Sequence, residues 1–193
     1  MVNTLEEKIE LINKELEKNE SNNPLEIVQS IMDRNFINIH GPEHHYLDGA
    51  SFLVAYKNAG GNIDLEKALE ELQIRTKKMP GAMCGLWGVC GSVAAIGACL
   101  SIINGTGPLS DNKFYKDNME YTSSVISKMS EIGGPRCCKR NAFISLLSGA
   151  EFVKRKYGIN MDIPKENKCK YSFKNEQCIK ERCPFYKEKK END

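Results

Sequence analysis

Hydrophobic residues recur at helical spacing along most of the chain. Leu5, Ile9, Ile12 and Leu16 form one stripe among charged residues, which predicts an amphipathic helix over residues 4–18. The same period predicts further helices over residues 24–34, 43–58, 111–131 and 135–157, and another that begins after Asp64. No segment alternates convincingly between apolar and polar residues, so we expect no β-sheet.

Proline and glycine mark the ends of these segments. Asn23 and Pro24 suit the N-cap and first position of the second helix, and Gly60-Gly61 suits the end of the third. Met79-Pro80-Gly81 and Gly133-Gly134-Pro135 interrupt the chain again, and we expect Pro135 to be the first residue of the last helix.

One long stretch, residues 81–110, contains no charged residue. It is long enough to span a bilayer, but its residues are small and Trp87 lies near one end only, without an aromatic belt at each end. We therefore expect a buried helix over about 84–104 rather than a membrane span. The predicted fold is all-α, a multi-helix bundle around this central uncharged helix.

The composition divides the chain into three parts. We expect an N-terminal amphipathic helix over residues 1–22, a helical core domain over 23–160 and a cysteine-containing module with a polar tail over 161–193. The last part has few aliphatic residues, so it needs a staple such as a bound metal to fold.

The net charge and the cysteine content favour some classes of function over others. The formal net charge is +1, which gives no argument for a nucleic-acid or anionic membrane partner. The first residues lack an apolar stretch after a basic start, so we expect a cytoplasmic protein without a secretory signal. Eight cysteines in a reducing compartment favour metal binding or redox chemistry over a disulfide framework.

Cys169, Cys178 and Cys183 lie in the polar C-terminal module. Three thiolates are an incomplete tetrahedral set, so a fourth ligand comes from elsewhere or one iron of a 4Fe–4S cluster stays open. Cys183-Pro184 resembles the end of an iron–sulfur ligand run. The alternative is a lysine-rich tail with unbound cysteines.

The run from Gly133 to Arg140 combines thiols with positive charge. Cys137 and Cys138 would lie in the first turn of a helix, where the helix dipole and nearby basic side chains lower a thiol pKa. We expect one of the two to be a ligand or nucleophile. Cofactor or substrate anions would bind at the helix start, with these residues as candidates: Gly133, Gly134, Arg136, Lys139. The alternative is that both thiols are packing residues.

Cys84 and Cys90 flank the start of the uncharged helix and are candidate ligands of a cofactor or metal. Six residues of α-helix rotate a side chain by about 240°, so the two cannot both face one ligand if both are helical. Glycines at 85, 88 and 91 allow close approach of a cofactor or of another backbone. Cys99 is expected in the core.

All three histidines lie within residues 40–45. His44 and His45 are candidates for a proton-transferring group or metal ligand, and Glu43 for a residue that orients one of them. Asp48 lies one turn further on and would line the same site. The alternative is a helix terminus with surface histidines.

Four runs together resemble an uncharacterised family of anaerobic bacteria and archaea: His-Gly-Pro-Glu-His-His, Pro-Gly-Ala-Met-Cys-Gly-Leu-Trp-Gly-Val-Cys-Gly, Gly-Gly-Pro-Arg-Cys-Cys-Lys-Arg and Cys-x4-Cys-Pro-Phe. In some members the domain is joined to a class I S-adenosylmethionine-dependent methyltransferase. The resemblance thus implies a methyltransferase as a partner. The Gly-x-Gly loop of that enzyme is absent here, so methyl transfer is not assigned to this chain.

These features predict an iron–sulfur protein, with a 4Fe–4S cluster, acting in desulfuration or sulfur transfer on a small anionic or sulfur-containing substrate. In this hypothesis Arg136 or Lys139 holds an anionic group, and His44 or His45 moves a proton. One alternative is a non-enzymatic zinc or iron–sulfur module that serves a partner protein. A third is a metal-free dithiol redox protein that uses Cys137 and a second cysteine and exchanges electrons with a redox partner.

Overall fold

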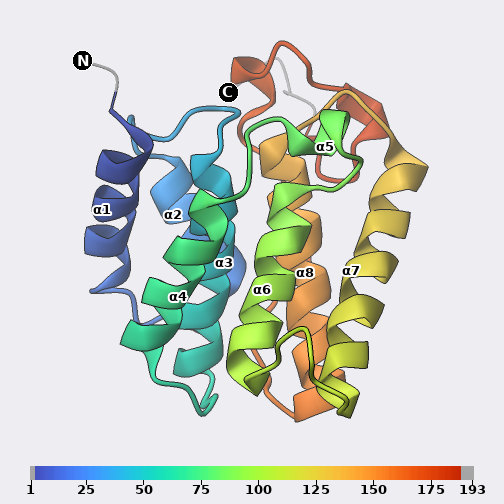
Figure 1. Ribbon diagram of the computed structural model, residues 1–193. Helices are drawn as coiled ribbons and strands as arrows, with labels where there is room; N and C mark the ends of the chain where they lie inside the picture. The colour runs from blue at the N-terminus through green and yellow to red at the C-terminus, as the bar shows by residue number, and fades with distance from the viewer. Residues whose placement is uncertain (1–2, 188–193) are drawn as a thin grey trace.

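Eight α-helices account for most of the residues that the computed structural model describes, which are 3–187 (Figure 1). Their bounds are α1 Leu5–Leu16, α2 Pro24–Met32, α3 Glu43–Asn58, α4 Leu65–Lys77, α5 Met83–Leu86, α6 Gly91–Asn104, α7 Lys113–Ile132 and α8 Cys138–Tyr157. Two short 3₁₀ turns follow, η1 Ser172–Lys174 and η2 Lys180–Arg182. Within this described part no strand forms, and Cys169 and Tyr186 make an isolated bridge. The all-α prediction is confirmed.

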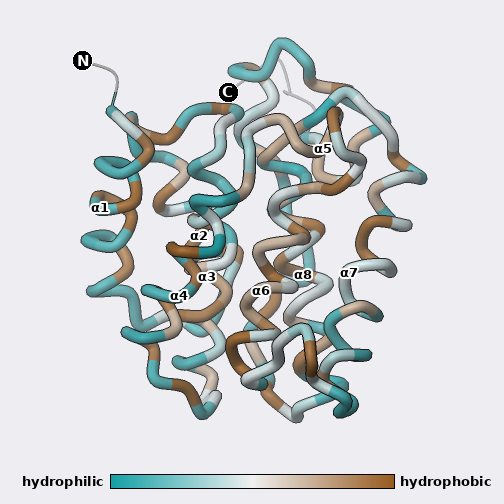
Figure 2. The backbone as a smooth tube through the Cα atoms, viewed as in Figure 1, coloured by the Kyte–Doolittle hydropathy of each residue, from teal (hydrophilic) through white to brown (hydrophobic). Residues whose placement is uncertain are grey.

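Helices α3 and α6 form the centre of the bundle. Helix α6 packs against α3, α4, α7 and α8, and α3 also contacts α1 and α2. Figure 2 shows that apolar positions continue around α6, whereas on α1 and α4 they alternate with hydrophilic ones. A helix that is apolar on all sides is buried, so the prediction of a central uncharged helix is confirmed. No helix among residues 3–187 is both long and apolar enough to cross a membrane.

Two predicted helix starts are wrong. The uncharged segment is not one helix, because it breaks between α5 and α6 where Gly88 has a φ of 71° that side chains rarely adopt. The break leaves exposed Leu86, the last residue of α5, and Trp87, which follows it. Helix α8 begins at Cys138 rather than Pro135, and Cys137 is its N-cap residue.

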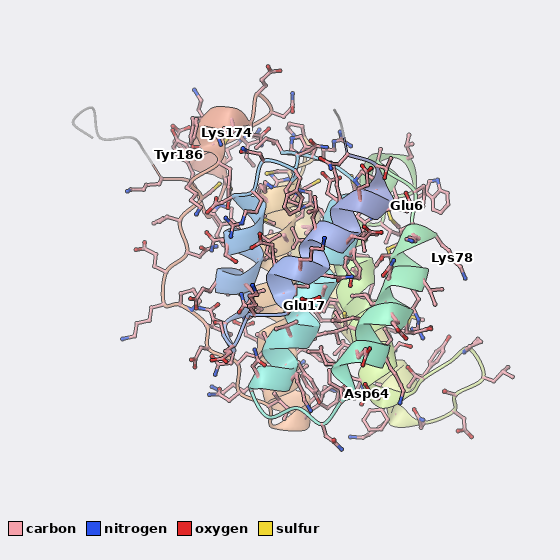
Figure 3. The ribbon with its side chains drawn as sticks, turned by 90° about the vertical axis from the view of Figure 1, so that its left-hand side faces the viewer. Glu6, Glu17, Asp64, Lys78, Lys174 and Tyr186 are labelled. Atoms are coloured by element: carbon pink, nitrogen blue, oxygen red, sulfur yellow. The ribbon has the colours of Figure 1, made fainter. Side chains whose placement is uncertain are left out.

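The C-terminal module folds back over one end of the bundle (Figure 1). Figure 3 shows its residues Lys174 and Tyr186 at the end of the molecule opposite to Asp64. The module anchors itself with few apolar side chains, among which Phe185 is buried and packs edge-on against Phe143 of α8 at 5.4 Å. Residues 1–2 and 188–193 of the predicted outer segments lie outside the described part of the chain.

A buried ion pair ties α1 to the start of α3. Lys8 donates a 2.7 Å hydrogen bond to the Glu43 carboxylate, and the backbone N–H of Asn38 donates another at 3.0 Å. Burial alone would raise the pKa of Glu43, but the hydrogen bonds from Lys8 and the backbone lower it below its ordinary value. Both charges are therefore compensated where the polar end of α3 enters the core.

Replacing Lys8 with alanine should be strongly destabilising. Lys8→Ala leaves the Glu43 carboxylate buried without its cation, which typically costs about 3–5 kcal/mol of unfolding free energy. The matched control is Arg34→Ala, which removes the more exposed pair with Glu15 and should cost about 1 kcal/mol or less. Urea denaturation measures both, and equal losses for the two variants would contradict this account of the pair.

Candidate functional site

A cavity of about 290 Å³ opens at the end of the bundle where α3, α5, α6 and α8 begin. We call it the histidine cavity, because His40, His44 and His45 all line it. Its remaining walls come from these residues: Gly41, Pro42, Asp48, Gly81–Cys84, Cys90–Ser92, Arg136–Cys138 and Asn141. Three sequence motifs that lie far apart in the chain therefore meet around one space.

His45 is a buried residue of this cavity and not a surface histidine. Its side chain packs so closely on the start of α6 that a Cβ atom at Gly91 would lie 2.2 Å from its Nε2. Of the three glycines at 85, 88 and 91, only Gly91 meets such a neighbour. Burial lowers the pKa of His45, so its ring is neutral at physiological pH and can accept a proton.

His44 links two buried charges across the wall of the cavity. Its Nε2 lies 3.0 Å from the Asn38 carbonyl oxygen and 3.3 Å from Nζ of Lys139. Its Nδ1 lies 3.8 Å from Oδ1 of Asp48, one turn along α3. Burial lowers the pKa of Lys139 to about 8, so a modest change in its surroundings alters the charge next to His44.

Two thiols of the cavity, those of Cys90 and Cys138, are held in their protonated form. Burial raises the pKa of Cys138 to about 12 and also raises that of Cys90. Asn141, one turn into α8, donates a hydrogen bond to Cys90 Sγ at 3.4 Å. The expected lowering of the thiol pKa at the helix start is wrong for Cys138, because desolvation outweighs the helix dipole.

A second, smaller cavity gathers the cysteines of the C-terminal module. This sulfur cavity has a volume of about 20 Å³ and is lined by four thiols, those of Cys137, Cys169, Cys178 and Cys183. Its walls also include the side chains of Lys139, Arg140, Tyr171, Ser172, Asn175, Ile179, Phe185 and Tyr186. The module therefore brings its three cysteines to a fourth, Cys137, which is the N-cap residue of α8.

Cys137 belongs to both cavities. As the N-cap of α8 it accepts a hydrogen bond from the backbone N–H of Arg140 at 3.4 Å, and Asn175 of the module donates another at 3.5 Å. The oxygen of the Asn175 side chain lies 3.1 Å from Nε2 of His40. Asn175 thus joins the module to the histidine cavity, and no local pattern in the sequence signalled it.

The other predicted site residues lie around these cavities. Glu43 is held by Lys8 and does not line either one. Arg136 is exposed at the rim of the histidine cavity. Gly133 and Gly134 line a groove of about 400 Å³ that shares Cys84, Cys90, Arg136 and Asn141 with the histidine cavity.

Two strained backbone positions accompany the two cavities. Ala82, in the wall of the histidine cavity, has a φ of 61°, and Lys180, between two cysteines of the module, has a φ of 48°. Such left-handed conformations cost of order 1–3 kcal/mol for residues other than glycine and cluster at functional sites. Among residues 3–187, no three histidine, cysteine, aspartate or glutamate side chains are arranged so that they could hold a single metal ion.

Comparison with known proteins places the chain in a family. Residues 12–186 match the model of a family of unknown function, DUF5714, and the chain belongs to it. No curated protein and no solved structure matches the chain. The family has no assigned activity, so the site geometry is the basis for a functional proposal.

Substitution of Gly91 should disturb His45. The added methyl group of Gly91→Ala cannot fit beside the His45 ring, and such overpacking typically costs about 1–3 kcal/mol of unfolding free energy. Gly85→Ala is the control, because a Cβ atom there meets no other atom within 4 Å. Denaturation and the NMR resonances of the His45 ring measure the effects; a Gly91→Ala variant that leaves both unchanged would refute the close packing.

Burial of His45 should also appear in the pH dependence of stability. Because its folded pKa lies below the unfolded value of 6.5, the unfolded chain binds more protons as the pH falls below 6.5. The unfolding free energy should therefore decrease as the pH falls through that range. The unfolding free energy of the His45→Gln variant should decrease less steeply. Denaturation at a series of pH values between about 4 and 8 measures the slopes, and identical slopes would argue against the lowered pKa.

Proposed function

We propose that the chain is an iron–sulfur protein that binds a 4Fe–4S cluster through Cys137, Cys169, Cys178 and Cys183 and supports sulfur or thiol chemistry in the histidine cavity. The observation that carries the proposal is that four thiols from two distant segments line one small cavity. Three of them lie in a module with few buried apolar side chains, for which ligand binding would supply folding free energy.

The arrangement of the four thiols favours a cluster over a single ion. Within residues 3–187, no three histidine, cysteine, aspartate or glutamate side chains are placed so that they could hold one metal ion. A tetrahedral zinc site needs its thiolates about 2.3 Å from one ion. A four-iron cluster attaches each thiolate to a different iron atom, so its ligand sulfurs stand farther apart.

The surroundings also suit a negatively charged centre. Lys139 and Arg140 line the sulfur cavity and would offset the charge of thiolate ligands. The N–H groups of Arg140 and Tyr171 donate to Cys137 Sγ and Cys169 Sγ, each at 3.4 Å. Hydrogen bonds to ligand sulfurs are among the features that tune the potential of such a cluster.

The chemistry proposed for the histidine cavity uses the residues of the chain itself. A bound cluster would supply electrons next to this cavity, since Cys137 lines both spaces. Cys90 and Cys138 are protonated thiols, and neutral His45 is the group that would accept a proton when a thiol reacts. Arg136 at the rim would hold an anionic group of the substrate.

A structural metal module that serves a partner protein is the second candidate. It is supported by the exposed Leu86 and Trp87 at the end of α5, because exposed apolar side chains suit a protein contact. The resemblance to a family joined in some members to methyltransferases makes such an enzyme the proposed partner. Either role requires a reducing compartment such as the cytoplasm, where the thiols stay available as ligands.

Metal and sulfide analysis of anaerobically purified protein tests the proposal. We expect about four iron and four sulfide per chain with absorption near about 400 nm, as a 4Fe–4S cluster requires. Cys178→Ser and Cys183→Ser should lose most of the iron. The matched control is Cys84→Ser, which removes another half-buried thiol. Cys84 lies in the histidine cavity, so this variant should keep its iron.

The outcomes separate the candidates. About one zinc per chain, lost in the same two variants, would replace the iron–sulfur proposal with the structural module. Protein that contains neither iron nor zinc, or that loses iron equally in Cys84→Ser, would overturn the assignment of the four ligands.

A further inference from the structure

Asp48 is a fully buried carboxylate that lines the histidine cavity. Within residues 3–187, neither of its oxygens has a hydrogen-bond partner. An isolated buried carboxylate is costly, and natural proteins almost always pair such a charge. Both oxygens of Asp48 are therefore free to accept hydrogen bonds from a ligand, above all from one that carries a positive charge.

The neighbours of Asp48 supply charge but no hydrogen bond. The nearest basic nitrogen, Nδ1 of His44, is 3.8 Å away, which is within ion-pair distance but too far for a hydrogen bond. The Asp48 charge also acts to raise the pKa of Lys139 and of His45, against the larger lowering by burial. Lys139 contacts His44 at the opposite ring nitrogen, Nε2. Two more buried polar atoms of the cavity, Nδ1 of His45 and Oγ of Ser92, also lack partners in the described part of the chain.

An organic cation suits this position better than a metal ion. No three donor side chains in residues 3–187 are arranged to hold a metal, so Asp48 would be left with too few co-ligands. An ammonium group instead carries three N–H donors and pairs with a carboxylate at short distance. The unpartnered ring nitrogen of His45 and hydroxyl of Ser92 offer further hydrogen-bonding atoms to the same ligand.

The rest of the cavity favours a negatively charged group. Arg136 lies at its rim, and the N-terminal residues Gly91 and Cys138 of α6 and α8 contribute to its walls. A guanidinium and two helix N-termini favour an anion such as a carboxylate. Between the two ends lie the thiols of Cys84, Cys90 and Cys138, and the volume of about 290 Å³ suits a small molecule.

We propose that the histidine cavity binds a free α-amino acid with a sulfur-containing side chain, and that Asp48 binds its ammonium group while Arg136 binds its carboxylate. This inference rests on the proposed function in placing the sulfur chemistry in this cavity, and it names the substrate class. The protein thus distinguishes its substrate from simple thiols and sulfide by the two charged groups on the α-carbon.

Isothermal titration calorimetry of the anaerobically purified holoprotein tests the site. The probe is S-methyl-L-cysteine, whose blocked sulfur neither removes metal nor forms mixed disulfides. Its matched analogues are 3-(methylthio)propanoate, which lacks the ammonium group, and 2-(methylthio)ethylamine, which lacks the carboxylate. We expect the amino acid to bind about tenfold or more tightly than either analogue, as expected for loss of a charge-assisted contact.

Two variants assign the charged groups to their residues. Asp48→Asn keeps the shape of the side chain and should weaken binding of the amino acid about tenfold or more, while binding of 3-(methylthio)propanoate changes little. Arg136→Gln should weaken binding of the amino acid and of 3-(methylthio)propanoate, but not binding of 2-(methylthio)ethylamine. Circular dichroism and thermal unfolding establish that both variants are folded, and the comparison of analogues on the unchanged protein does not depend on either variant.

The results separate this inference from the iron–sulfur proposal. Equal binding of all three ligands, no binding of the amino acid, or full affinity in Asp48→Asn would overturn the ammonium site. Iron and sulfide are measured on the same samples: Asp48-dependent binding by protein without iron would overturn the cluster alone. Cluster-loaded protein that binds the amino acid no more tightly than 3-(methylthio)propanoate would overturn the amino-acid site alone.

Discussion

The hydrogen bonds to the sulfur of Cys137 fix how the two cavities sit against each other. This sulfur caps α8 by accepting the N–H of Arg140, and it also accepts the amide of Asn175 from the C-terminal module. The Arg140 side chain in turn donates to the carbonyls of Gly133 and Pro135, each at 3.1 Å, which holds the loop before the helix. The start of α8, the loop and the module therefore share one set of contacts.

This arrangement couples the module to the histidine cavity over a very short path. Cys138 follows Cys137 directly and lines the histidine cavity, while His40 reaches the module through Asn175. Any movement of the module that displaces Cys137 must disturb the first turn of α8 and the thiol beside it. A buried polar network of this kind transmits such changes because its members have few alternative partners.

The sequence predicts the helices well wherever local signals agree. Helix α3 has the expected bounds, and the central position of α6 follows from its lack of charge. The clustering of histidines and cysteines near helix starts also indicated which side chains meet in the histidine cavity. These features depend on periodicity, capping residues and composition, all of which act over a few residues.

What the sequence does not reveal depends on contacts between distant segments. That Cys137 faces the three cysteines of the module, and that Asn175 bridges both cavities, requires the tail to fold back by more than the length of α8. The raised pKa of Cys138 is of the same kind, because its burial is set by the packing of α8 against residues of other helices. Helix-dipole reasoning from the sequence alone gave the opposite direction.

Helix α3 carries one buried carboxylate that the fold compensates and another that we propose a ligand compensates. Glu43 and Asp48 lie on the same helix and both are almost completely buried. The Glu43 carboxylate receives hydrogen bonds from Lys8 and from the backbone of Asn38, so the fold itself compensates its charge. Asp48 receives none from residues 3–187, although the core around the rest of the helix is well packed with apolar side chains. A carboxylate with no stabilising role in the fold weakens it, and a ligand that binds there would offset that cost.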